Sequence, residues 1–255
     1  MTIFDNRCFG YCSDCGTTHT LGTGAAVAYA YELMNKIELA ERLDIDVPLS
    51  ESDPSLRTEV LFPGDRGHMF GVLETRNAQE ETVWLKAFSS LKGGIRQVTG
   101  WVPPVLSTET YDQLINPEEY AIKELTKQID STSDSTARKA LTQRRAKRSQ
   151  ALWVAMRDSY RMVNQQGKER GLKALFGDQG IPGGTGECCG PKLLCYANRN
   201  QLTPIGLVEF YWGPSTTYEG KSSGSFHPCC EPRCRPLLGF LLCPGIESED
   251  PSAAN

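Results

Sequence analysis

Hydrophobic positions in the first half of the chain repeat with a helical period and then with a strand-like one. Residues 25–40 place Val27, Tyr31, Met34 and Leu39 near one face, which predicts an amphipathic helix. Three short apolar runs then predict strands, at 60–62, 68–74 and 82–88. The polar segment 75–81 predicts a hairpin turn between the last two. The Cys- and Gly-rich residues 1–24 show neither period, so we expect them to be irregular.

The second half begins with a long helical pattern over 117–176 and a break near 131–135. Its apolar positions recur at helical spacing, and most of the others are polar or basic; the apolar ones are Leu141, Leu152, Met156, Tyr160 and Val163. Residues 188–197 predict a further helix with Pro191 in its first turn. A strand is predicted over 207–212, and an apolar helix follows the cysteines of 228–242.

These elements predict an α+β protein. It has a small mixed sheet, a long basic helical insertion and a Cys-rich metal-binding end. The expected organisation has four parts: an N-terminal Cys-rich and β-hairpin part at 1–116, the basic helical insertion at 117–176, a Cys-rich part completing the core at 177–245, and a tail at 246–255.

Charge is unevenly distributed along the chain. The formal net charge is −4, yet residues 138–173 contain eleven basic and two acidic side chains. Such a segment on an acidic protein predicts a polyanionic partner, RNA first of all. The candidate RNA-binding residues are Arg138, Lys139, Arg144, Arg145, Lys147 and Arg148. The alternative is a solvated amphipathic helical hairpin whose charges contact only water.

Ten cysteines suggest metal-binding chemistry. The chain shows no secretory leader and no apolar run long enough to cross a membrane, so we expect a cytoplasmic, reducing compartment, where clustered thiols bind metal more often than they form disulfides. Zinc prefers thiolates and imidazoles. One zinc site is predicted from Cys188, Cys189, Cys230 and Cys234, with the choice between Cys188 and Cys189 open. Buried packing or redox-active thiols are the alternative.

A second zinc site is predicted near the N-terminus. Cys8, Cys12 and Cys15 are followed by His19, which offers a fourth ligand for a zinc knuckle. The same cysteine spacing occurs in the iron–sulfur motif of radical-SAM enzymes. Only seven residues precede Cys8, too few for the first strand of their barrel, so zinc is the simpler interpretation.

The order of elements around the C-terminal cysteines resembles that of the zinc-dependent nucleobase deaminases. In that family one ligand starts a helix, a strand follows, and a cysteine pair starts the next helix. The resemblance implies a hydrolytic zinc and a glutamate two residues after the first ligand. Gly190 stands at that position if Cys188 is the ligand. The remaining candidates for the catalytic acid are Glu187, Glu209 and Glu231.

A broader resemblance links most of the chain to the N-terminal extension of long RluA-type pseudouridine synthases. The shared stretches occur in the same order. They are Cys8-Phe9, His19-x-Leu21 with Ala25-Ala26, GHMFGVL at 67–73, LKAFS at 85–89, WVPP at 101–104, Tyr160 to Leu172, GTGECCGPKLL at 184–194 with Tyr196-Ala197, EFYWG at 209–213, FHP at 226–228, Cys230-x3-Cys234, and PLLG at 236–239. The resemblance implies an RNA-modification context, with tRNA or rRNA as the partner.

The catalytic motif of that family, RLD followed by T-S-G, is not found in this sequence. Pseudouridine synthase activity is therefore not expected of this chain alone, although a synthase catalytic domain could be a partner in trans. The leading hypothesis is a zinc-binding, RNA-associated module. The alternative is a deaminase-like zinc hydrolase acting on a nucleobase or nucleotide. A third hypothesis is a redox or scaffold protein with exposed thiols.

Overall fold

A computed structural model describes residues 7–62, 67–89, 94–215 and 220–245, so the predicted tail at 246–255 lies outside the described residues. Helices and small sheets are combined in one structure, which confirms the predicted α+β class. Among the described helices, none is long and apolar enough to cross a membrane.

The largest sheet has four strands in the order β4-β3-β7-β8. They are β3 (His68–Arg76), β4 (Thr82–Phe88), β7 (Thr203–Trp212) and β8 (Phe226–His227). The predicted hairpin is confirmed as β3 and β4, and each described pairing in this sheet is antiparallel. The prediction of a mixed sheet is therefore wrong, because β3 runs opposite to both of its neighbours.

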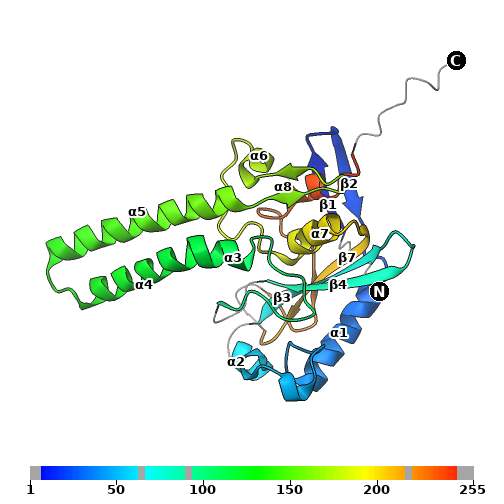
Figure 1. The fold of residues 1–255 in the computed structure, drawn as a ribbon, viewed down its shortest axis with the longest axis horizontal. Coiled ribbons are helices and arrows are strands. Elements are labelled where there is room, and N and C mark those ends of the chain that lie inside the picture. The colour runs from blue at the N-terminus through cyan, green and yellow to red at the C-terminus, as the bar shows by residue number, and fades with distance from the viewer. Residues whose placement is uncertain (1–6, 63–66, 90–93, 216–219, 246–255) are drawn as a thin grey trace.

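The sheet lies between two helical layers (Figure 1). Helix α1 (Ala26–Ala40) contacts β3 and β7 on one face, and α7 (Cys189–Arg199) contacts β3, β4 and β7 on the other. Side chains alternate along each strand, so Phe70 and Val72 of β3 join the core with α1, whereas Leu73 joins the core with α7. Both layers are therefore anchored by one central strand.

The N-terminal segment is regular, although its sequence predicts an irregular one. Strands β1 (Cys8–Cys12) and β2 (Thr17–Leu21) form an antiparallel hairpin that packs on α8 (Arg235–Leu241). Gly10 and Gly239 make this contact possible: a Cβ on Gly10 would lie 2.3 Å from the Gly239 backbone nitrogen. Backbone of the strand therefore meets backbone of the helix. Position 60–62 also differs from its prediction, because α2 (Thr58–Leu61) replaces the expected strand.

The basic insertion forms a helical arm that projects from the body of the molecule (Figure 1). Helix α4 (Asn116–Ser131) packs on α5 (Ser135–Ser159), and the predicted break falls between them. Asp134 caps α5 by accepting hydrogen bonds from the backbone N–H groups of Thr136 and Ala137.

The helical prediction for 160–176 is wrong for most of that segment. After α5 the chain returns to the core as β5 (Met162–Val163), β6 (Glu169–Arg170) and the short helix α6 (Leu172–Phe176). Tyr160, Met162 and Leu172 are fully buried there. Their apolar spacing reflects burial against several elements rather than one helical face. The remaining short elements are η1 (Leu49–Glu51), η2 (Pro54–Leu56), α3 (Thr108–Thr110) and the π-helical η4 (Tyr111–Ile115).

Candidate metal centres

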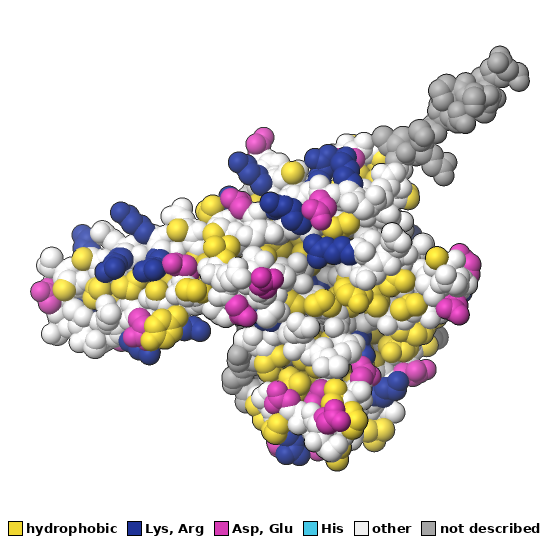
Figure 2. Space-filling view, in the orientation of Figure 1, with side chains coloured by type: hydrophobic (Ala, Val, Ile, Leu, Met, Phe, Trp, Pro, Cys, Tyr) yellow, Lys and Arg dark blue, Asp and Glu magenta, His cyan; other side chains and the backbone are white. Residues whose placement is uncertain are grey.

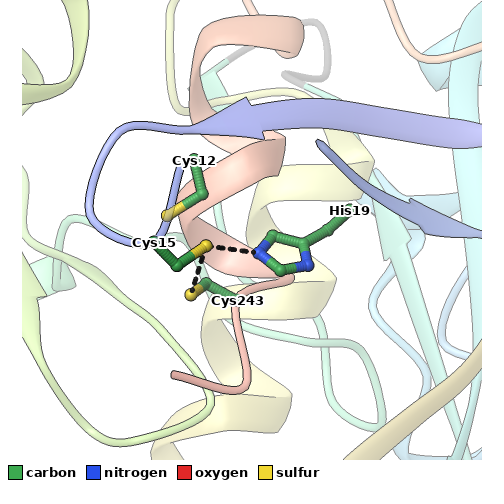
Figure 3. A group of neighbouring side chains, drawn as sticks. All are labelled: Cys12, Cys15, His19 and Cys243. Atoms are coloured by element: carbon green, nitrogen blue, oxygen red, sulfur yellow. Dashed lines mark hydrogen bonds between the residues drawn. The ribbon is translucent and has the colours of Figure 1, made fainter. Parts of the chain in front are cut away.

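Cluster 1 consists of Cys12, Cys15, His19 and Cys243. Their four ligand atoms all lie within 4.8 Å of one another. The Cys15 sulfur lies 3.1 Å from His19 Nε2 and 3.6 Å from the Cys243 sulfur. Figure 3 shows the first three side chains coming from the β1–β2 hairpin and Cys243 from the segment that follows α8. The group can hold a metal ion with four protein ligands.

The structure brings Cys243, and not the predicted Cys8, to cluster 1. Cys8 and Cys12 lie at opposite ends of β1, and four residues of strand span about 13 Å. Cys8 is instead a hydrogen-bond neighbour of Cys229. Cys243 is separated from Cys15 by 228 positions, so no local spacing could have indicated it.

The surroundings of cluster 1 favour a thiolate at Cys15. Burial alone raises the pKa of this thiol. Hydrogen bonds to His19, to the backbone of Thr17 and to Cys243 outweigh burial and lower the pKa to about 6. The thiolate is the form that binds metal. Cluster 1 thus carries a ligand that ionises readily at neutral pH.

Cluster 2 consists of Cys188, Cys230 and Cys234, whose sulfur atoms lie within 4.8 Å of one another. Cys188 is the N-cap of α7 and Cys234 the N-cap of α8. The Cys230 sulfur lies 3.8 Å from that of Cys188 and 3.3 Å from that of Cys234. Hydrogen bonds from these two thiols lower the pKa of Cys230, so it ionises first. The N-termini of α7 and α8 therefore meet at one group of thiols.

The geometry distinguishes Cys188 from Cys189. The Cys189 side chain points to the sheet, where its sulfur donates to the Met69 carbonyl at 3.3 Å. A Cβ on Gly71 would lie 2.7 Å from the Cys189 Cβ, so α7 packs closely on β3 here. The structure therefore places Cys189 in the packing layer and Cys188 in cluster 2.

Of the three glutamates considered as catalytic acids, Glu209 lies in the interior beside cluster 2. It is 6% exposed on β7, and its Oε1 accepts a hydrogen bond from the Gly190 N–H at 2.6 Å. Burial raises the pKa of Glu209 to about 7. Its negative charge also contributes to the raised pKa of Cys234, after the hydrogen bonds with Cys188 and Cys230 and after burial. The charge of this carboxylate is therefore part of the electrostatic surroundings of cluster 2.

The other two glutamates have different surroundings. Glu187 accepts a hydrogen bond from the Tyr160 hydroxyl and lies 3.5 Å from Arg96 and 3.6 Å from Lys192. This charge is matched by two cations. Glu231 is exposed and pairs with Arg235 at 2.9 Å on the surface. The partners of Glu187 and Glu231 therefore direct both carboxylates away from the sulfur atoms of cluster 2.

The six predicted RNA-binding residues all lie on α5. Four of them are exposed, namely Arg138, Lys139, Arg144 and Lys147. Arg145 is half-buried, and Arg148 pairs with Glu118 of α4 at 2.6 Å, so its charge is already matched. Figure 2 shows Lys and Arg side chains along the edge of the arm formed by α5. From 135 to 157 the helix has no acidic side chain, so every charged side chain that α5 contributes over this range is basic.

Comparisons with known proteins add no relative: no protein-family model, no curated protein sequence and no solved structure matches this chain. The fold and the two clusters define an α+β protein with two groups of side chains that could each hold a metal ion.

Proposed function

We propose that this protein binds zinc at clusters 1 and 2 and associates with RNA through the exposed basic side chains of α5. The observation that carries the proposal is the convergence of three thiols and one imidazole in cluster 1 from two distant segments. Soft sulfur ligands with one imidazole suit zinc in tetrahedral geometry. Packing alone does not require four such groups within 4.8 Å.

The RNA part of the proposal is supported by charge and shape. The arm projects from the body and carries four exposed cations on α5. Exposed cations on a projecting helix can neutralise phosphates, which is the main source of sequence-independent nucleic-acid affinity. The resemblance to the extension of RluA-type pseudouridine synthases adds a context, namely modification of tRNA or rRNA, with the catalytic domain supplied by a partner.

Metal content tests the zinc proposal directly. We expect the protein purified without added metal to contain about two zinc ions per chain, measured by mass spectrometry. Cys230→Ser with Cys234→Ser should remove one, and Cys15→Ser should remove the other. Cys195→Ser is the matched control, because Cys195 is buried outside both clusters. Wild-type protein without zinc contradicts the proposal.

A second candidate function is a zinc hydrolase that resembles the nucleobase deaminases. The specific observation in its favour is Glu209, a buried carboxylate beside cluster 2 that hydrogen-bonds to Gly190, the position where that family carries its glutamate. Such an enzyme replaces the exocyclic amino group of a base with oxygen from water and releases ammonia.

Ammonia release from cytidine, adenosine and single-stranded RNA tests this second candidate. We expect turnover by the wild type, a decrease of at least about 100-fold in Glu209→Gln, and no activity in Cys230→Ser. Glu74→Gln is the control, because Glu74 is also a buried carboxylate that accepts a backbone hydrogen bond, from Ala25 at 2.7 Å. Tight RNA binding without ammonia release would exclude the hydrolase.

A further inference from the structure

The two clusters differ in the number of ligands that the protein provides. Cluster 1 has four, and cluster 2 has three. Among the described residues, no further His, Cys, Asp or Glu brings a ligand atom within 4.8 Å of all three sulfurs of cluster 2. Zinc with four protein ligands is closed, whereas zinc with three keeps one position for another molecule.

Neighbouring groups that might complete cluster 2 are directed elsewhere. The Cys189 sulfur donates to the Met69 carbonyl. The Cys229 thiol is hydrogen-bonded to that of Cys8. Glu209 Oε1 is held by the Gly190 N–H at 2.6 Å. Each of these side chains already has a partner, so the low ligand number is a property of the packed structure.

Gly190 fixes where the Glu209 carboxylate lies. A Cβ at position 190 would be 3.3 Å from Glu209 Oε1 and 3.0 Å from the Cys229 sulfur. Any side chain there would crowd the carboxylate between α7 and β7. The absence of a side chain at Gly190 lets Glu209 reach the first turn of α7, directly after Cys188. A buried carboxylate in this place is a strong hydrogen-bond acceptor.

Cluster 2 can be reached by a small molecule. Cys188 and Cys230 are half-buried, and only Cys234 is fully buried. Residues near Cys230 are open to solvent as well, since Pro228, Glu231, Pro232 and Arg233 are exposed. A ligand would therefore approach cluster 2 from the side of Cys188 and Cys230.

We infer that the metal in cluster 2 keeps one coordination position for an exchangeable small ligand, and that Glu209 is the positioning residue that accepts a hydrogen bond from this ligand. The ligand class is a small molecule that binds the metal through oxygen, nitrogen or sulfur and carries a hydrogen-bond donor on that atom or close to it. This inference rests on the proposed zinc binding. It assigns different tasks to the two metals, since cluster 1 is closed and cluster 2 is open.

Cadmium-113 NMR of the full chain tests this inference, because each bound cadmium gives its own resonance. We expect two resonances, assigned by their disappearance in Cys15→Ser and in Cys230→Ser. Titration with 2-mercaptoethanol, whose thiolate would bind the metal and whose hydroxyl would donate to Glu209, should shift the cluster 2 resonance progressively and leave that of cluster 1 in place. Cluster 1 is therefore an internal control in the same sample.

The Glu209→Gln variant tests the positioning role. We expect it to retain cadmium in cluster 2 but to bind 2-mercaptoethanol about tenfold more weakly, as is typical when a group that orients a metal ligand is removed. Glu74→Gln should titrate like the wild type. Unchanged affinity in Glu209→Gln would overturn the positioning role.

Three other results would overturn the open position. If 2-mercaptoethanol shifts neither of the two resonances, cluster 2 is closed. Disappearance of the cluster 2 resonance in Glu209→Gln would make Glu209 a fourth ligand. A single resonance, absent in Cys15→Ser, would mean that cluster 2 takes no metal, and the two-zinc proposal would then fail together with this inference.

Discussion

Removal of zinc from cluster 1 is expected to lower the melting temperature of this protein by about 10–20 °C. The β1–β2 hairpin has little hydrophobic support of its own, because of the five residues of β2 only Leu21 is buried. An isolated two-stranded hairpin is marginal in water. A metal that joins Cys15 to Cys243 closes a loop of 228 residues, and a cross-link of that length removes about 5 kcal/mol of chain entropy from the unfolded state.

A decrease of about 5 kcal/mol in the free energy of unfolding corresponds to this temperature shift for a chain of this size. Calorimetry before and after chelation measures it in the Cys230→Ser/Cys234→Ser variant, whose remaining zinc is that of cluster 1, and added zinc should restore the original transition. Cys243→Ser in the same background should melt near the chelated variant without any chelator. Cys195→Ser in this background should leave the melting temperature unchanged. Complete zinc release with an unchanged melting temperature would contradict a structural role for cluster 1.

Charge reversal on α5 is expected to abolish most of the RNA affinity. In Lys139→Glu/Arg144→Glu/Lys147→Glu, three exposed cations become anions on a helix whose other charges from 135 to 157 are all basic. Removing one cation–phosphate interaction should reduce the slope of log affinity against log salt by about one, so the slope of the triple variant should fall by about three. Fluorescence anisotropy with transcribed tRNA at several salt concentrations measures both affinity and slope.

The matched control reverses three exposed cations outside the arm, in Lys36→Glu/Arg57→Glu/Arg235→Glu. Net charge falls equally in both variants, so a general electrostatic effect would weaken both. We expect the control to keep the salt slope of the wild type. If the two variants bind tRNA alike, the basic edge of α5 is only a solvated surface.

Local patterns of apolar residues were sufficient to predict most elements of the central sheet and of the helices that pack on it. Helix α1 begins one residue from its predicted start, and the β3–β4 hairpin ends at Phe88 as predicted. The helix after Cys188 and the strand of β7 were also predicted from the sequence. Helix α1 buries one face, so its apolar period matches the backbone. Strands β3 and β7 are buried on both faces, and short apolar runs indicated them.

The β1–β2 hairpin could not be predicted in this way. Threonines occupy most of β2 and face solvent, and the strand is held by the backbone contact between Gly10 and Gly239. Because glycine has no side chain, neither residue contributes to a hydrophobic pattern in the sequence. The contact also joins positions near opposite ends of the described chain, so no short window contains it.

The candidate sites show the same division. Composition and spacing predicted the type of ligand. They also predicted five cluster members that lie close together in sequence, namely Cys12, Cys15, His19, Cys230 and Cys234. Cys243 was missed because it is placed by the end of α8. To decide between Cys188 and Cys189 as the ligand, the rotation of α7 about its axis must be known. Gly71 fixes this rotation, because the lack of a side chain there allows Cys189 to approach β3.

Cluster 1 also has a consequence for the order in which the protein is made. Cys12, Cys15 and His19 are synthesised early, whereas Cys243 follows Cys15 by 228 residues. At about 5–20 residues per second, ribosomes need about 10–50 s to cover that distance. During this interval the nascent hairpin offers three ligands without the fourth and lacks α8, on which it packs. Cluster 1 can therefore close only after Cys243 has been made, and a metal ion bound by all four side chains would mark chains in which these distant segments have met.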